Sequence, residues 1–151
     1  MSPEGRNKVY EQLRIDEGVV YEVYLDHLDL PTLGVGHLIL ESDLEHGSAV
    51  GTKVSEERVR TLFESDLDTA IQECEVLYDC WETLPEPVQE ILVNMMFNMG
   101  RPRLSGFKKM NAAIAEGDWY TASVEGRDSR WYKQVGNRAN RLMSRLEVMV
   151  L

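Results

Sequence analysis

The sequence predicts an α+β fold in which helices predominate and a small antiparallel sheet lies near the N-terminus. Three observations support this prediction: apolar residues recur at helical spacing over most of the chain, Val, Tyr and Thr are enriched between residues 20 and 40, and Gly34 and Gly36 alternate there. With 151 residues and an apolar fraction of 43%, the chain is long enough for one well-buried core and has the composition of a globular protein.

The first helix is predicted to begin at Ser2-Pro3-Glu4, because Ser is a favoured N-cap and Pro fits the first turn. Val9, Leu13 and Glu17 then fall on one stripe, since residues four apart are neighbours on a helix surface. Gly18 is expected to end the helix. This spacing places a carboxyl group in the last turn, on the apolar side.

The strand segment extends from Val20 to Leu40, and the turn is predicted at Asp29-Leu30-Pro31. Residues 41–53 have the composition of a loop. A long helix is then predicted from about Ser55 to Leu77. Its helically spaced apolar residues are Val59, Leu62, Phe63, Leu67, Ala70 and Ile71.

Pro85 and Pro87 separate this helix from the next one, which extends from Val88 to Met99. This later helix, residues 88–99, is apolar on most sides and is therefore expected to be central. Its methionines, like Trp81, Trp119 and Trp131, are interpreted as core residues. Gly100 ends it, and three or four shorter helices follow.

Charge limits the partners that can be expected. The chain has 16 Lys and Arg against 26 Asp and Glu, a net charge of −10. Residues 127–151 hold six basic and two acidic groups, net +4, which leaves −14 for residues 1–126. Such an acidic protein is not expected to bind nucleic acid, because phosphate affinity depends on clustered Lys and Arg. The basic C-terminal segment is interpreted as the cationic face of a terminal helix, although an acidic partner stays possible.

Membranes and metals are also not expected. No apolar stretch approaches the roughly 20 residues of a bilayer span, and the N-terminal residues lack the apolar core of a secretory signal. Cys74 and Cys80 are expected to be reduced, since a bridge would require the helix to end near Tyr78. The three histidines lie nine or ten residues apart, without zinc-type spacing, so no metal or other cofactor is predicted.

Glu17 is a candidate general acid. Partial burial beside Val9 and Leu13 and the negative end of the helix dipole both disfavour its ionised form. A general acid must still hold its proton near neutral pH, so its pKa must be raised in this way. Judged alone, a surface glutamate at a frayed helix end is the better interpretation.

Asp26 and Thr32 change that balance. If the strands fold back around Asp29, these two residues oppose each other on one face with Cβ atoms about 5 Å apart, where they could hold one water. The turn and strand preferences of Asp and Thr also explain both residue types without any ligand. One carboxyl biased towards protonation and another left ionised is, however, the arrangement that hydrolyses glycosidic bonds.

These residues lie in segments that resemble the signature of the T-even phage lysozymes, glycoside hydrolase family 24. Eight residues separate Glu17 from Asp26 and five separate Asp26 from Thr32, which opens a T-x-G-x-G-H motif. This spacing is highly specific. The resemblance covers nearly the whole chain in order, through Leu13–Gly18, Tyr24–Asp26, Thr32–Leu38, Leu62–Asp68, Asn94–Gly100, Ser129–Tyr132 and Asn137–Arg141.

The resemblance implies a muramidase that hydrolyses the β-1,4 bond between N-acetylmuramic acid and N-acetylglucosamine in peptidoglycan, with inversion at the anomeric carbon. By position, Glu17 matches the general acid of the family, Asp26 the second carboxylate, and Thr32 the hydroxyl that helps to place the water. The implied partner is bacterial peptidoglycan, and the implied form is a monomer without cofactors.

The resemblance also assigns supporting roles. Leu38 and Phe97 match positions that line the sugar cleft. Arg138 matches an arginine that holds the acid in place, and His37 with Asp66 matches a structural ion pair. The implied fold is a single lysozyme domain, residues 1–151, with a β-containing lobe at about 18–54 and a connecting helix at about 55–77. A helical lobe at about 78–151 would include the N-terminal helix.

Three positions depart from the family pattern. Asp29 stands where the family prefers Gly in the turn, at a site expected to need a positive φ. Met110 and Glu125 stand where the archetype has polar sugar contacts, so those subsites are in question.

Two other function classes compete with a free muramidase. One is a virion-associated component that mainly binds the wall, with hydrolysis secondary or lost. The other is a lytic transglycosylase, against which the presence of Asp26 counts. The sequence is compatible with two locations for the protein. It could be made in the host cytoplasm and reach the wall by holin-dependent release, or it could be attached to a virion tail.

Overall fold

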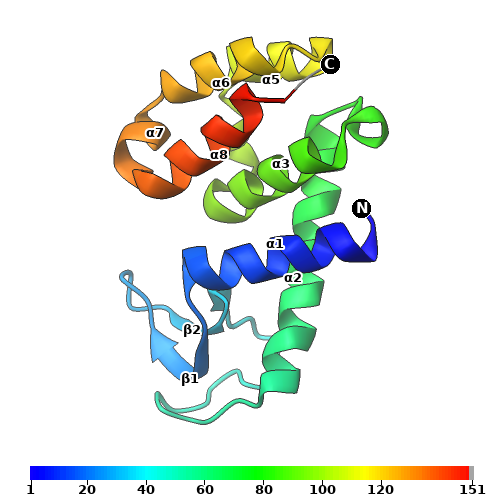
Figure 1. Cartoon of the computed structure of the whole chain (residues 1–151). Coiled ribbons are helices and arrows are strands. Elements are labelled where there is room, and N and C mark those ends of the chain that lie inside the picture. The colour runs from blue at the N-terminus through cyan, green and yellow to red at the C-terminus, as the bar shows by residue number, and fades with distance from the viewer. Residues whose placement is uncertain (150–151) are drawn as a thin grey trace. The chain divides into compact units, whose positions relative to one another are not determined.

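The computed structural model describes residues 1–149, and Val150 and Leu151 lie outside the described part. The order of elements confirms the α+β prediction (Figure 1). The N-terminal half contains α1 (Pro3–Glu17), β1 (Val20–Leu25), β2 (Pro31–Gly34), β3 (His37–Leu38) and α2 (Glu56–Leu77). After a 3-10 turn at Trp81–Thr83 come α3 (Glu86–Met99), α4 (Arg101–Ser105), α5 (Lys108–Glu116), α6 (Trp119–Arg127), α7 (Arg130–Val135) and α8 (Asn137–Glu147).

The chain divides into two compact units. One comprises Asn7–Thr69, and the other comprises residues 1–6 together with the residues from Ala70 onwards. Most of α1 therefore groups with the sheet, and the unit boundaries fall inside α1 and α2 rather than at the residues expected from the sequence. The description of the whole chain as one lysozyme domain stays a prediction.

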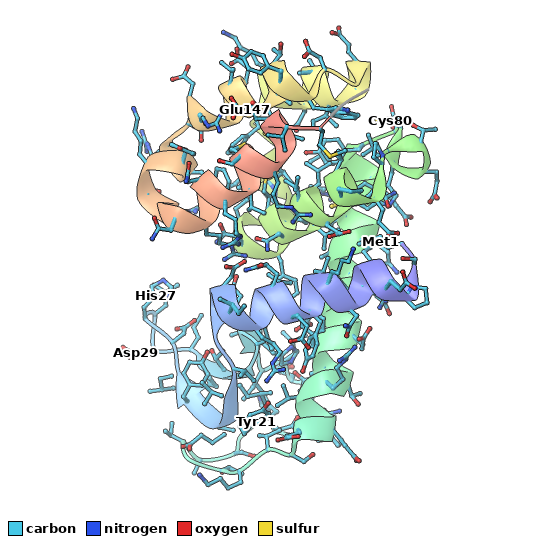
Figure 2. The ribbon with its side chains drawn as sticks, in the orientation of Figure 1. Met1, Tyr21, His27, Asp29, Cys80 and Glu147 are labelled. Atoms are coloured by element: carbon cyan, nitrogen blue, oxygen red, sulfur yellow. The ribbon has the colours of Figure 1, made fainter. Side chains whose placement is uncertain are left out.

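The unit formed by Asn7–Thr69 is built around the sheet, whose strands are antiparallel in the order β1-β2-β3. The register pairs Tyr24 with Thr32 and Thr32 with Leu38, so Thr32 is central in its row. The turn between β1 and β2 covers residues 26–30, three residues earlier than its predicted start at Asp29. Figure 2 shows His27 and Asp29 at the tip of this hairpin.

The core of this unit is formed by buried side chains from β1, β2, α1 and α2. Leu13, Val23, Leu33 and Leu67 are fully buried. Gly34 has a φ of +61°, and a Cβ atom there would lie only 3.0 Å from Val59 on α2. The glycine is therefore required by both the backbone conformation and the close approach of the helix.

The other unit is helical. As predicted, α3 is central, with every residue from Val88 to Met96 buried, and Trp81, Trp119 and Trp131 are buried as well. Helices α5, α6 and α8 pack together beside it (Figure 1). At the N-terminus, the Ser2 backbone N–H and hydroxyl donate to the two carboxylate oxygens of Glu86 at 2.9 and 2.6 Å.

Cys74 and Cys80 are both free thiols, and burial raises the pKa of Cys74 to about 12. No helix within residues 1–149 is long and apolar enough to cross a membrane. Across the same residues, no three His, Cys, Asp or Glu side chains gather into a group that could hold a metal ion.

Candidate active site

Glu17 is the last residue of α1, and its side chain is half-buried. Leu13, one turn earlier, is fully buried and fixes which side of the helix faces the core. The Glu17 side chain lies against the β2–β3 turn, because a Cβ atom on Gly36 would lie 3.7 Å from Glu17 Oε2. The end of α1 and the sheet thus position this carboxyl group together.

Asp26 begins the hairpin turn. Its Oδ1 accepts hydrogen bonds from the backbone N–H groups of Leu28 at 2.8 Å and Leu30 at 3.0 Å. These two donors, Leu30 first, hold the pKa of Asp26 below its usual value. The turn also places Asp29 at a φ of +60°, the positive value expected there. Asp26 is therefore an ionised carboxylate in a fixed orientation.

Thr32 is 4% exposed, and its hydroxyl donates to the Leu30 carbonyl oxygen at 2.9 Å. The prediction that Thr32 opposes Asp26 is wrong, because Thr32 pairs with Tyr24 and the Asp26 N–H donates to the Leu30 carbonyl. The pairing is displaced by two residues: Asp26 begins the turn one residue beyond β1, and its backbone N–H shares the Leu30 carbonyl acceptor with the Thr32 hydroxyl.

Tyr24 was not singled out from the sequence. It is half-buried beside Thr32. Burial, followed by the negative charges of Asp26 and Glu17, raises the pKa of Tyr24. The Tyr24 hydroxyl is therefore close enough to both candidate carboxylates to be affected by their charges. Its position two residues before Asp26, in the same strand segment, is the signal that could have identified it.

His37 and Asp66 form the ion pair that the resemblance implies, with 2.6 Å between Nδ1 and Oδ2. A second carboxylate was missed: Asp43 Oδ2 lies 2.8 Å from Nε2 of the same ring. Asp43 belongs to the loop after β3, where no periodic pattern marks it. Leu38, adjacent to His37 and paired with Thr32, is 44% exposed.

Phe97 and Arg138 belong to the helical unit. Phe97 is half-buried near the end of α3. Arg138, in the first turn of α8, donates from Nε to the Asn94 side-chain oxygen at 2.9 Å and from Nη2 to the Asn94 carbonyl at 3.3 Å. The roles assigned to Phe97 and Arg138 stay predictions.

The helical unit also contains a cavity of about 840 Å³. Met110 and Glu125, the two positions that depart from the family pattern, both line it. Its charged lining is mixed and consists of Arg103, Lys108, Lys109, Glu125, Asp128 and Arg130.

Known proteins match this chain over most of its length. A family described as phage lysozyme matches residues 14–148. The pre-baseplate central spike protein Gp5 of Enterobacteria phage T4 is 33% identical over 150 residues, which cover 87% of this chain but only 26% of the spike protein. Two Dictyostelium discoideum proteins named probable T4-type lysozyme 2 and 1 are 32% and 29% identical. Their alignments cover 94% and 96% of those proteins and 93% and 96% of this chain.

Proposed function

The chain belongs to the phage lysozyme family of peptidoglycan hydrolases, and we propose that it cleaves the β-1,4 bond between N-acetylmuramic acid and N-acetylglucosamine with inversion. In this proposal Glu17 is the general acid that protonates the glycosidic oxygen. Asp26 is the base that orients and activates water, and Thr32 helps to hold that water. The enzyme acts as a monomer without a cofactor.

The observation that carries this proposal is the state of Asp26. Two backbone N–H groups hold its carboxylate ionised and in one orientation, and its own backbone N–H shares the Leu30 carbonyl acceptor with the Thr32 hydroxyl. A base that activates water must be ionised, and a fixed orientation lowers the entropic cost of placing the water.

The Thr32 hydroxyl supports the same assignment. Because its hydrogen is donated to the Leu30 carbonyl, its oxygen is left to accept a hydrogen bond. A water held between Asp26 and Thr32 would then direct its hydrogens to them and its lone pair to the sugar. Inversion further requires the acid and base to stand roughly 6.5–9.5 Å apart, which leaves room for that water.

A product assay tests the proposal. We expect the wild-type protein to reduce the turbidity of outer-membrane-permeabilised cells and to release reducing muramic acid ends. Proton NMR of the first-formed anomer on a defined muropeptide should show inversion. Anhydro-muramic products would instead indicate a transglycosylase, and a first product with retained configuration would contradict the water-placing role of Asp26 and Thr32.

A virion-associated role is the second candidate, and the similarity to the spike protein Gp5 favours it. In this case the chain would act at the wall from a phage particle rather than as a free enzyme released through a holin pore. Immunoblotting of purified particles against the lysate supernatant separates the two: the chain in particles supports the virion role, and its confinement to the supernatant supports the free enzyme.

A further inference from the structure

Carboxylates accept hydrogen bonds at both ring nitrogens of His37. Asp66 on α2 is 2.6 Å from Nδ1, Asp43 in the loop after β3 is 2.8 Å from Nε2, and the His37 side chain is only 7% exposed. Because ionised carboxylates only accept, both ring nitrogens must donate, and the ring carries two protons. Burial alone lowers the pKa of His37, but the hydrogen bonds and charges of Asp66 and Asp43 outweigh it, so the pKa is raised.

Asp43 contacts more than the histidine. The same Oδ2 atom accepts the backbone N–H of Leu40 at 2.8 Å, two residues beyond the end of β3. Asp43 is 12% exposed, so this oxygen is held largely away from solvent. One carboxylate therefore ties the ring of His37 to the chain that leaves β3.

The other charges around these groups come from α2 and the loop. Arg58 on α2 binds Glu45 of the loop through Nε at 2.8 Å and Nη2 at 3.0 Å. The positive charge of Arg58 favours the ionised form of Asp43, while Glu45 bears the same charge as Asp43. The ring of His37 itself faces Asp66 and Asp43.

His37 lies between the residues that contact the proposed catalytic groups. Gly36, immediately before it, packs against the Glu17 side chain. Leu38, immediately after it, is the sheet partner of Thr32. A displacement of β3 would thus reach both the proposed acid and the residue proposed to hold the water.

We propose that Asp43 is a positioning residue for the hydrolytic site, and that Asp43, His37 and Asp66 form a proton-dependent clasp that holds β3 beside Glu17 and Thr32. This inference rests on the proposed function for its effect on catalysis. The clasp itself is a property of residues 37–66 and can be tested without substrate.

Protonation of His37 sets the state of the clasp. When the ring loses one proton, only one nitrogen can donate, and one carboxylate is left facing a lone pair. An unpaired carboxylate at a largely buried site is unfavourable, so it moves towards water. Asp66 is fixed within the 22-residue helix α2, whereas Asp43 belongs to a loop, so Asp43 is the residue that leaves. The clasp is closed at low pH and opens as pH rises through the raised pKa of His37.

NMR of the isotopically labelled full chain tests the clasp directly. We expect the Leu40 amide to shift and to exchange faster with water at the same midpoint as the titration of the His37 ring nitrogens. Asp43→Asn should lower that midpoint. The matched control is Glu41→Gln, which removes an exposed carboxylate two residues away and should leave the midpoint in place. A wild-type Leu40 amide that does not respond while His37 titrates would overturn the clasp, even if Asp43→Asn does not fold.

Hydrolysis measured from neutral to alkaline pH tests positioning. We expect the kcat of the wild type to fall as His37 loses its proton. In Asp43→Asn the same fall should occur at lower pH, with a severalfold loss of kcat on the alkaline side, an unchanged KM, and no such change in Glu41→Gln. Identical profiles for Asp43→Asn and wild type would overturn the positioning role. A wild type without hydrolytic activity would instead overturn the proposed function and leave the NMR result valid.

Discussion

Thr32→Val separates the structural role of the Thr32 hydroxyl from its proposed catalytic role. The substitution removes one hydroxyl and keeps nearly the same shape. The Leu30 carbonyl that accepts from Thr32 at 2.9 Å also accepts from the Asp26 N–H at 3.0 Å, so it keeps a donor. We therefore expect a loss of only about 1 kcal/mol in the free energy of unfolding, the net value of one ordinary hydrogen bond.

Turnover should fall much more than stability. If the Thr32 oxygen accepts a hydrogen bond from the attacking water, its loss removes a preorganised polar contact to a reacting group. Such contacts are worth roughly 100-fold in kcat. KM should change little, because the contact matters most as the water attacks.

Initial rates of reducing-end release on a soluble muropeptide substrate, together with thermal unfolding, measure both effects. Thr32→Ser keeps the hydroxyl and is the matched control, which should retain most of the activity. A folded Thr32→Val protein whose kcat equals that of the wild type would refute the role of Thr32 in placing the water.

Three further predictions concern the carboxylates. Glu17→Gln should keep the fold but lose nearly all hydrolysis, because an amide cannot donate a comparable proton; substantial activity in the folded variant would remove Glu17 from the mechanism. Asp26→Ala should be inactive while Asp26→Glu keeps some activity, and a carboxyl-carbon NMR titration should find Asp26 half-protonated below pH 3.8; an active Asp26→Ala would contradict the paired-carboxylate mechanism. Asp66→Asn should lower the free energy of unfolding by about 2 kcal/mol, the value of a hydrogen bond to a charged group. Because the folded-state pKa of His37 is raised above 6.5, denaturant unfolding should show this loss in full below pH 6.5 and show it shrinking as pH rises through the folded-state pKa; a loss independent of pH would contradict the pairing.

Local patterns predicted the elements of this chain well. The stripe of Val9, Leu13 and Glu17 places Glu17 in the last turn of a helix that ends just before Gly18. The apolar residues on most sides of α3 indicate a buried helix, as observed. In both cases the spacing of side chains within one helix is enough to predict its position and its buried side, without knowledge of any distant contact.

Register and loop contacts were harder to predict. The hairpin turn begins at Asp26 because its side chain accepts the N–H groups of Leu28 and Leu30, a local arrangement that competes with continued strand pairing. The alternation of residues along a strand does not reveal this turn. The prediction therefore paired Thr32 with Asp26, two residues away from its actual partner. Asp43 was missed for a related reason. Its contact with His37 depends on the path that the loop takes in the folded protein, and no local pattern encodes that path.

The contact between Ser2 and Glu86 has a consequence for the order in which the chain folds during synthesis. Residues 1–6 are synthesised before residues 7–69, yet they belong to the unit that also contains the residues from Ala70 onwards. Their partner Glu86 lies 84 positions later in the chain. Residues 7–69 can therefore form their own unit before residues 1–6 contact Glu86. The N-terminal turn of α1 reaches its final contacts only after α3 has begun to emerge from the ribosome.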